Sequence, residues 1–225
     1  MNKTALITGV GRGIGKALAL RFLSAGDFVI GTYLKTKPDY THEHLTLLPL
    51  DLTDSSSIRE CVESVTKLGK KIDILINNAG ALFDEDDTEV VIDKLRKTLE
   101  VNLIGTVDFT EQVLSIINKN SHIINISSRA GSHAMEEQDS SHNPYHYPAY
   151  RISKAALNMY TVTLSRLLEQ RKIIVSSVHP GWVRTDMGGQ EADITPEEAA
   201  ENIYEFANSQ PASGQFWFKG KQLPW

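Results

Sequence analysis

The stretch TALITGVGRGIG, residues 4–15, joins a short apolar run to four closely spaced glycines. The run 4–10 is typical of a parallel strand buried on both faces, and residues 16–25 have the apolar spacing of a helix. Glycines between a strand and a helix let the chain turn sharply and bring backbone N–H groups close to a phosphate. Such glycines also serve plain strand-to-helix packing, so this stretch alone leaves both interpretations open.

The rest of the chain repeats the alternation of strand and helix. Apolar runs predict further strands at 28–33, 45–52, 72–76, 122–128, 173–178 and 216–218. Helical spacing predicts helices at 56–68, 88–118, 149–170 and 196–208. This alternation implies a parallel sheet covered by helices on both faces. We expect an α/β single-domain Rossmann fold over residues 1–225, with a doubly wound parallel sheet of about seven strands. Its cofactor half would span about 1–125, and its catalytic and substrate half about 126–225.

Composition excludes several classes of partner. The net charge of −5 provides no basic surface for nucleic acid or an anionic membrane. No apolar stretch approaches the ~20 residues of a membrane span, and no signal-peptide core precedes the first strand. Cys61 is the one cysteine of the sequence, so it cannot form an internal disulfide. We expect a soluble cytoplasmic protein that binds neither nucleic acid nor membrane.

A second stretch, YRISK at residues 150–154, opens a helical pattern. Tyr150 and Lys154 stand four residues apart, so a helix places both side chains on one face. Pro148 suits the first turn of that helix. An ammonium beside a phenol favours the phenolate and should lower the tyrosine pKa from its ordinary value near ~10. The same spacing occurs on many solvated helix faces, and the other motifs must decide.

Two polar segments, 129–147 and 188–195, interrupt the alternation. Ligands of open α/β sheets bind beyond the carboxyl ends of the strands, where both segments fall, so both are expected to border the substrate. The first segment carries His133, His142 and His146. Their spacing matches no regular ligand pattern, and no carboxylate cluster completes a set, so we expect a solvated loop and no metal.

Five motifs occur together in an order and spacing that are typical of one family. They are TGVGRGIG at 8–15, NNAG at 77–80, Ser128, Tyr150-x-x-x-Lys154 and Pro180-Gly181. On these motifs, which span essentially the whole chain, the sequence resembles the short-chain dehydrogenase/reductases. The segment SVHPGWVRTDMGG at 177–189 and the final LPW resemble the branch of C-factor and sniffer-type carbonyl reductases.

The resemblance implies a catalytic set of four residues. Tyr150 would be the general acid that protonates a carbonyl oxygen as hydride arrives, or the base in the reverse direction. Lys154 would hold the ribose hydroxyls and lower the tyrosine pKa, Ser128 would donate a hydrogen bond to the substrate oxygen, and Asn102 would support Lys154 through ordered water. Preorganised donors of this kind stabilise the charge that hydride addition builds on oxygen. Ser127 is the alternative to Ser128, and only one of the pair should reach the site, because successive strand side chains point to opposite faces.

The end of the second strand bears on which nicotinamide cofactor binds. An acidic residue there would bind the ribose 2′-OH of NAD and repel the 2′-phosphate of NADP. The strand instead ends near Tyr33 and Lys35 with no carboxylate, while Arg12 in the glycine turn and Lys37 add positive charge. Arginine suits phosphate because its fork donates two parallel hydrogen bonds. We expect NADP(H) in preference to NAD(H); for Arg12 alone, the alternative is a surface arginine with no partner.

The resemblance implies further cofactor contacts. Asp51 with Leu52, and Asn78 with Ala79, would enclose the adenine, and residues 183–185 would hold the carboxamide and pyrophosphate. A turn or helix-cap carboxylate is the alternative for Asp51. The whole expected set is Gly9, Gly11, Arg12, Gly13, Ile14, Gly15, Tyr33, Lys35, Asp51, Leu52, Asn78, Ala79, Gly80, Tyr150, Lys154, Pro180, Gly181, Val183 and Thr185.

The segment 132–147 is longer than the family pattern, which leaves substrate shape and subunit contacts open. Phe83, this segment and residues 187–196 are expected to line the substrate pocket. A homodimer or homotetramer is implied by the resemblance, and a monomer stays open.

The sequence leaves two hypotheses for the function of the protein. The leading hypothesis is an NADPH-dependent carbonyl reductase acting on a small-molecule carbonyl or alcohol. The alternative is an NADPH-binding signalling or sensor protein of C-factor type with little turnover. A pterin or an acyl-carrier ketone as substrate ranks lower, because the sequence has no basic patch for an acyl carrier.

Overall fold

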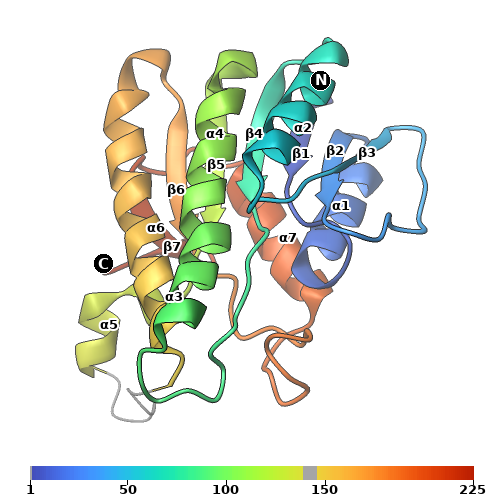
Figure 1. Cartoon of the computed structure of the whole chain (residues 1–225). Coiled ribbons are helices and arrows are strands. Elements are labelled where there is room, and N and C mark those ends of the chain that lie inside the picture. Colours follow the sequence, from blue (N-terminus) through green and yellow to red (C-terminus); the bar gives the residue numbers. More distant parts are fainter. Residues whose placement is uncertain (1, 139–145) are drawn as a thin grey trace.

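One sheet of eight strands, in the order β3-β2-β1-β4-β5-β6-β7-β8, runs through residues 2–138 and 146–225, which the computed structural model describes (Figure 1). The strands are β1 (Thr4–Ile7), β2 (Phe28–Tyr33), β3 (Leu45–Pro49), β4 (Ile72–Asn77), β5 (Ile117–Ile126), β6 (Ile174–Val178), β7 (Gln215–Phe218) and β8 (Lys221–Leu223). The first seven are parallel, and β8 pairs antiparallel with β7. The strand order reverses between β1 and β4, which is where open α/β sheets bind ligands.

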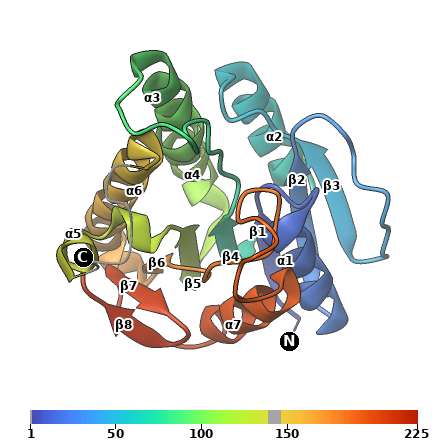
Figure 2. The same cartoon turned by 90° about the horizontal axis from the view of Figure 1, so that it is seen from below.

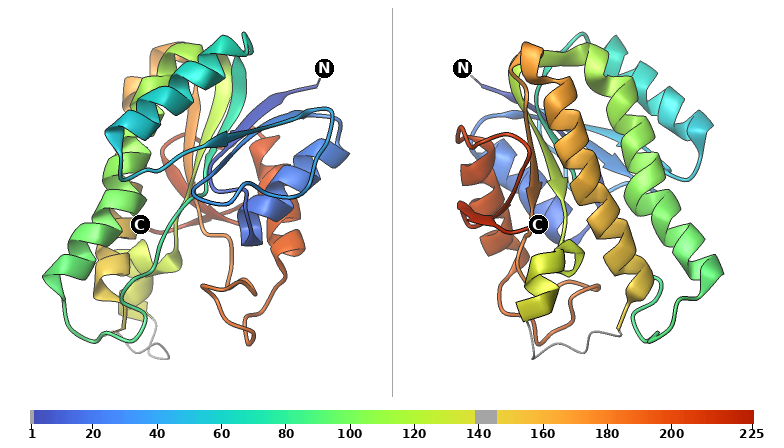
Figure 3. Two further views of the ribbon diagram at one scale, coloured as in Figure 1. Left: turned by 45° about the vertical axis from the view of Figure 1, so that its right-hand side comes forward. Right: turned by 90° about the vertical axis from the view of Figure 1, so that its left-hand side faces the viewer.

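Helices cover both faces of this sheet (Figure 2). One face carries α1 (Gly13–Ser24) and α7 (Pro196–Ala207), and the other carries α2 (Ser55–Lys67), α4 (Thr106–Val113) and α6 (Pro148–Leu167). Helix α3 (Ile92–Leu99) continues through a π-helical turn, Glu100–Gly105, into α4, and the combined helix runs beside α6 (Figure 3). The expected single-domain α/β Rossmann-like fold is confirmed.

Alternating strand residues build the two cores. Ile7 of β1 packs with α1 and α7, whereas its neighbour Leu6 packs with the α2, α4 and α6 side. This is the period-two pattern of a strand buried on both faces. One strand therefore supplies side chains to both layers of the core.

Two elements differ from the sequence predictions. Strand β8 was not expected; it follows a tight turn in which Lys219 and Gly220 have φ of 47° and 72°, values that suit a hairpin. Helix α5 (His133–Gln138) lies where a solvated loop was expected, and the Ser132 hydroxyl accepts a hydrogen bond from Met135 N at 3.2 Å in its first turn.

The bounds of other elements also differ from the predicted ranges. Strand β3 stops at Pro49, β5 begins at Ile117, and the predicted 88–118 helix is interrupted by the π-helical turn. Gly105 ends that turn, and a Cβ atom built there would lie 1.9 Å from Leu52 O. Glycine is therefore required for the helix to approach the end of the 50–52 segment. No helix in residues 2–138 and 146–225 is long and apolar enough to cross a membrane.

Candidate active site

The glycine turn after β1 and the NNAG motif after β4 form one hydrogen-bonded unit. Thr8 Oγ1 accepts hydrogen bonds from Asn78 N and Ala79 N, both at 3.0 Å. Asn78 Nδ2 donates to Thr8 O at 2.8 Å and to Gly9 O at 3.2 Å. A Cβ atom at Gly15 would lie 2.1 Å from Gly9 O, so only glycine permits this close packing. The two motifs, about 70 residues apart, meet at the strand reversal.

The N-terminus of α1 suits a phosphate group. Arg12, which precedes the helix, makes no side-chain hydrogen bond that caps it, and the first turn carries no acidic residue. Gly9 and Gly13 adopt positive φ of 73° and 53°, and a Cβ atom at Gly11 would meet nothing within 4 Å among the described residues. Backbone N–H groups and the helix dipole at such an end attract anions. The donor set therefore fits the pyrophosphate of a dinucleotide.

The segment that follows β6 closes against this turn. Val183 pairs with Ile194 in an isolated bridge, which folds the segment back on itself. A Cβ atom built at Gly13 would lie 3.1 Å from Thr185 Cγ2, and the exposed Arg12 and Asp186 side chains form an ion pair. Gly181 has φ of 98°, and a Cβ atom there would lie 2.8 Å from Ile194 Cδ1. The expected residues of both segments therefore border the same edge of the sheet.

The ends of β2 and β3 contribute the remaining residues expected around the adenosine half. Tyr33 is half-buried, Lys35 is exposed and Leu52 is buried. Asp51 Oδ1 accepts hydrogen bonds from Thr53 N at 2.9 Å and Thr53 Oγ1 at 2.7 Å, so this carboxylate stabilises a turn. The cap of α2 is Asp54, whose side chain accepts from Ser56 N.

Tyr150 lies in the first turn of α6, facing Ser128. Burial raises the pKa of Tyr150 to about 12, and a hydrogen bond with the Ser128 side chain acts in the opposite direction. Ser127 instead donates to Asn158 Oδ1 at 2.6 Å, on the α6 side of the sheet. Ser128, and not Ser127, therefore contacts the tyrosine.

Lys154 lies one helical turn after Tyr150 in α6 and is almost fully buried. Its Nζ donates to Ile126 O at 2.8 Å and lies 5.5 Å from the centre of the Tyr150 ring. Burial lowers the pKa of Lys154 to about 8. The net shift at Tyr150 is opposite to the expected lowering, because desolvation of the phenolate is its largest cause and raises the pKa.

Asn102 lies in the π-helical turn and is also buried. Its Oδ1 accepts from Ala81 N at 2.7 Å, and its Nδ2 donates to Ala81 O at 2.9 Å and Ser153 Oγ at 3.1 Å. A Cβ atom at Gly80 would lie 3.4 Å from Asn102 Oδ1 and 3.6 Å from Lys154 Nζ. Gly80 therefore keeps open the space between the amide and the ammonium.

Two residues at this site were not expected from the sequence. Asp186 pairs with Arg12, and Asp84 contacts the backbone of Tyr150. A signal for Asp84 was present: the residues just before Pro148 offer no Ser, Thr, Asp or Asn to cap the predicted helix, so the cap had to come from elsewhere.

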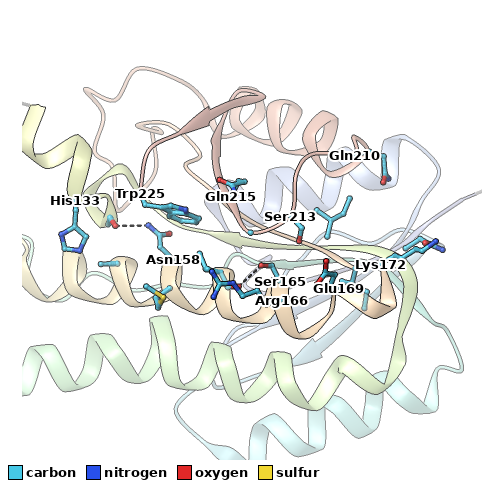
Figure 4. A pocket seen from close by; sticks show the side chains of 18 residues that line it. His133, Asn158, Ser165, Arg166, Glu169, Lys172, Gln210, Ser213, Gln215 and Trp225 are labelled. Carbon is cyan, nitrogen blue, oxygen red and sulfur yellow. Dashed lines mark hydrogen bonds between the residues drawn. The ribbon is translucent and has the colours of Figure 1, made fainter.

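A pocket of about 910 Å³ lies away from these residues, between α6 and the C-terminal strands (Figure 4). Asn158, His133, Arg166 and Trp225 are among its lining residues, whereas Ser128, Tyr150 and Lys154 are not. Asn158 donates to Gly131 O at 3.0 Å on its wall. The pocket is thus distinct from the predicted site.

The described part of the chain contains no group of three or more His, Cys, Asp or Glu side chains that could hold a metal ion. His142, one of the three histidines considered above, lies outside the described residues.

Comparisons with known proteins agree with the motifs. The family model described as short chain dehydrogenase matches residues 3–196. The chain is 34% identical over 216 residues to the 3-oxoacyl-(acyl-carrier-protein) reductase of Thermotoga maritima, covering 88% of this chain and 80% of that protein. It is similar to the structure of NADPH-bound carbonyl reductase from chicken fatty liver, with a TM-score of 0.88 and 30% identity over 100% of this chain and 99% of the other. The carbonyl reductase Sniffer of D. melanogaster gives a TM-score of 0.88 at 26% identity, with 100% of both chains covered.

Proposed function

Because this chain belongs to the short-chain dehydrogenase family, as its motifs predicted, we propose that it is an NADPH-dependent reductase of small carbonyl compounds. The family and its carbonyl reductase relatives make the chain an oxidoreductase. One observation supports the finer proposal: Tyr150 contacts the Ser128 side chain, and the Nζ of the buried Lys154 lies 5.5 Å from the centre of the Tyr150 ring.

The proposed residue roles follow from the charge that develops on the substrate. The nicotinamide would supply the hydride. Tyr150 would transfer its phenolic proton to the carbonyl oxygen as negative charge builds there, and Ser128 would donate a second hydrogen bond to that oxygen. A pKa near 12 keeps the phenol protonated at neutral pH, which an acid requires. Lys154, with a pKa of about 8, would be mainly charged at pH 7 and would favour the phenolate that remains.

The proposed coenzyme contacts divide along the edge of the sheet. The α1 N-terminus and residues 183–185 would bind the pyrophosphate and carboxamide, and residues 51–52 and 78–79 would enclose the adenine. Arg12 and Lys35 would receive the 2′-phosphate. The absence of an acidic side chain at the end of β2 and the NADPH bound to the chicken relative support NADP(H) over NAD(H).

The substrate would be a carbonyl compound with an apolar body. Phe83, Trp182 and Met187 are exposed on the segments that follow β4 and β6, at the same edge of the sheet as Tyr150. Apolar side chains at a ligand site favour apolar ligands. An acyl-carrier ketone, the substrate type in the name of the Thermotoga relative, is disfavoured by the net charge of −5, since acyl carriers need a basic surface.

The test is NADPH oxidation over a panel of aromatic and aliphatic aldehydes and ketones. Tyr150→Phe should lower kcat/KM for a reduced substrate by about 10²–10⁴-fold, the usual contribution of a positioned acid, while NADPH binding changes little. Turnover that survives Tyr150→Phe would refute the proposed mechanism. NADPH binding without reduction of any panel member would instead favour a sensor protein.

A further inference from the structure

The helix that carries Tyr150 has no cap of its own. Tyr147, which precedes α6, is in the left-handed conformation and makes no side-chain hydrogen bond to the helix. Pro148 has no N–H, so the first donors that need a partner are those of Ala149 and Tyr150. Most helices meet this need with a side chain from the residue just before the first turn.

Asp84 supplies the acceptor from 65 residues upstream. Its Oδ2 accepts from Ala149 N at 2.6 Å and lies 3.4 Å from Tyr150 N. The side chain is 1% exposed, so water does not compete for these donors. The segment after Gly80 therefore reaches directly to the backbone of the proposed acid.

The same segment also holds the residue before the helix. Tyr147 N donates to Asp87 O at 3.0 Å, and Asp87 N donates to Asp84 O at 3.0 Å, which closes a turn. Lys94 Nζ of α3 donates to Asp87 Oδ1 at 2.8 Å. Three backbone N–H groups at the start of α6, those of Tyr147, Ala149 and Tyr150, thus contact one segment of the coenzyme half.

The placement of Asp84 goes beyond what a cap requires. Its Oδ1 is buried with no hydrogen-bond partner among residues 2–138 and 146–225, which is costly for a carboxylate. Asp54 caps α2 with an exposed side chain and avoids that cost. A helix N-terminus offsets part of the cost through its dipole, and burial makes the contact rigid.

We propose that Asp84 is a positioning residue for the reaction: it fixes the Tyr150 phenol relative to the coenzyme half of the site. The inference rests on the proposed role of Tyr150. Because a misplacement of about 1 Å can cost about 10²-fold in rate, removal of this contact should act mainly on kcat.

Asp27 provides a matched control. It too is a buried aspartate whose Oδ1 accepts from a backbone N–H, that of Lys3 at 2.9 Å. Its Oδ2 likewise has no partner among the described residues. It precedes β2, at the edge of the sheet opposite the site.

The experiment compares Asp84→Ala, Asp84→Asn and Asp27→Ala in the full chain. Asp84→Ala should lower kcat by about 10–100-fold while the NADPH Kd stays within about twofold. Asp84→Asn keeps an acceptor for Ala149 N and should recover most of the loss. Asp27→Ala should lower the melting temperature comparably and leave kcat unchanged. Equal loss of kcat in Asp27→Ala and Asp84→Ala would overturn the proposal.

A second measurement does not depend on turnover. With ¹³C at the tyrosine ζ carbon, and Tyr150→Phe to assign the signal, Asp84→Ala should shift the Tyr150 resonance and Asp27→Ala should not. An unmoved resonance would overturn the positioning role even if kcat falls. If the wild type reduces no carbonyl, the proposed function fails, and this spectrum still decides the placement of Tyr150. Should Asp84→Ala not fold, Asp84→Ser, whose shorter side chain withdraws the acceptor, serves in its place.

Discussion

The floor of the site and its rim are built differently. The floor, Asn102, Lys154 and Asp84, is buried, and each of its side chains bonds to backbone from another element. The rim, here Arg12 and Asp186, is exposed and joined by a single ion pair. Packed, dry contacts fix geometry, whereas exposed pairs contribute little because water and salt compete with them. The floor can therefore hold reacting groups in place, and the rim can adjust to what binds.

The same substitution, glycine to alanine, should have different effects in the two regions. Gly131→Ala places a Cβ atom 2.6 Å from Lys154 C and 2.8 Å from Ala155 N, which are backbone atoms under the floor. Overpacking of this kind costs about 1–3 kcal/mol and should displace Lys154, so the free energy of unfolding and kcat should both fall. Urea unfolding and steady-state kinetics measure the two quantities.

The matched change at the rim is Gly11→Ala, whose Cβ atom meets no described atom within 4 Å. Its free energy of unfolding should stay within about 0.5 kcal/mol of wild type, while NADPH binding weakens because the Cβ atom enters the proposed phosphate site. Equal destabilisation by the two variants would contradict the distinction between floor and rim.

Burial of Lys154 should also appear in the pH dependence of stability. The pKa falls from 10.5 to about 8 on folding, so between these values the folded protein binds fewer protons than the unfolded chain. The free energy of unfolding should therefore rise with pH in that window, by up to about 1.4 kcal/mol per pH unit. The raised pKa of Tyr150 acts with the opposite sign, but only above pH 10.

Urea unfolding at pH 8, 9 and 9.5 tests this. The difference between the free energies of wild type and Lys154→Met should grow by about 1–2 kcal/mol over that range, because only the wild type loses the buried proton. Parallel pH profiles would mean that Lys154 stays charged in the folded state.

The features that could be predicted from the sequence are those that follow a local pattern. The strands, the glycine turn and the pair Tyr150 and Lys154 obey local periods and spacings, so they were found without coordinates. The cap at Asp84 was not, because it joins residues 65 positions apart. The predicted direction of the Tyr150 pKa shift was wrong, because residue spacing shows the neighbouring charge but not how deeply the phenol is buried. Strand β8, only three residues long, is defined by its pairing with β7 and carries no pattern of its own.

At the rim, Arg12 provides a test of coenzyme choice. If its guanidinium binds the 2′-phosphate, Arg12→Ala should weaken NADPH by roughly tenfold, about 1.4 kcal/mol, and leave NADH nearly unchanged. Fluorescence titration of both coenzymes measures this ratio. Equal losses for NADPH and NADH would contradict the phosphate contact.

The partner of Arg12 should act in the opposite direction and more weakly. The Asp186 carboxylate forms an ion pair with the Arg12 guanidinium and would also repel a 2′-phosphate. Because an exposed ion pair is worth about 0.2–1 kcal/mol, Asp186→Asn should tighten NADPH binding by about two- to fivefold and leave NADH unaffected. In the Arg12→Ala background the same change should have a smaller effect, since the competition for the guanidinium is gone. A full effect of Asp186→Asn without Arg12 would show that the carboxylate acts directly on the coenzyme and not through the arginine.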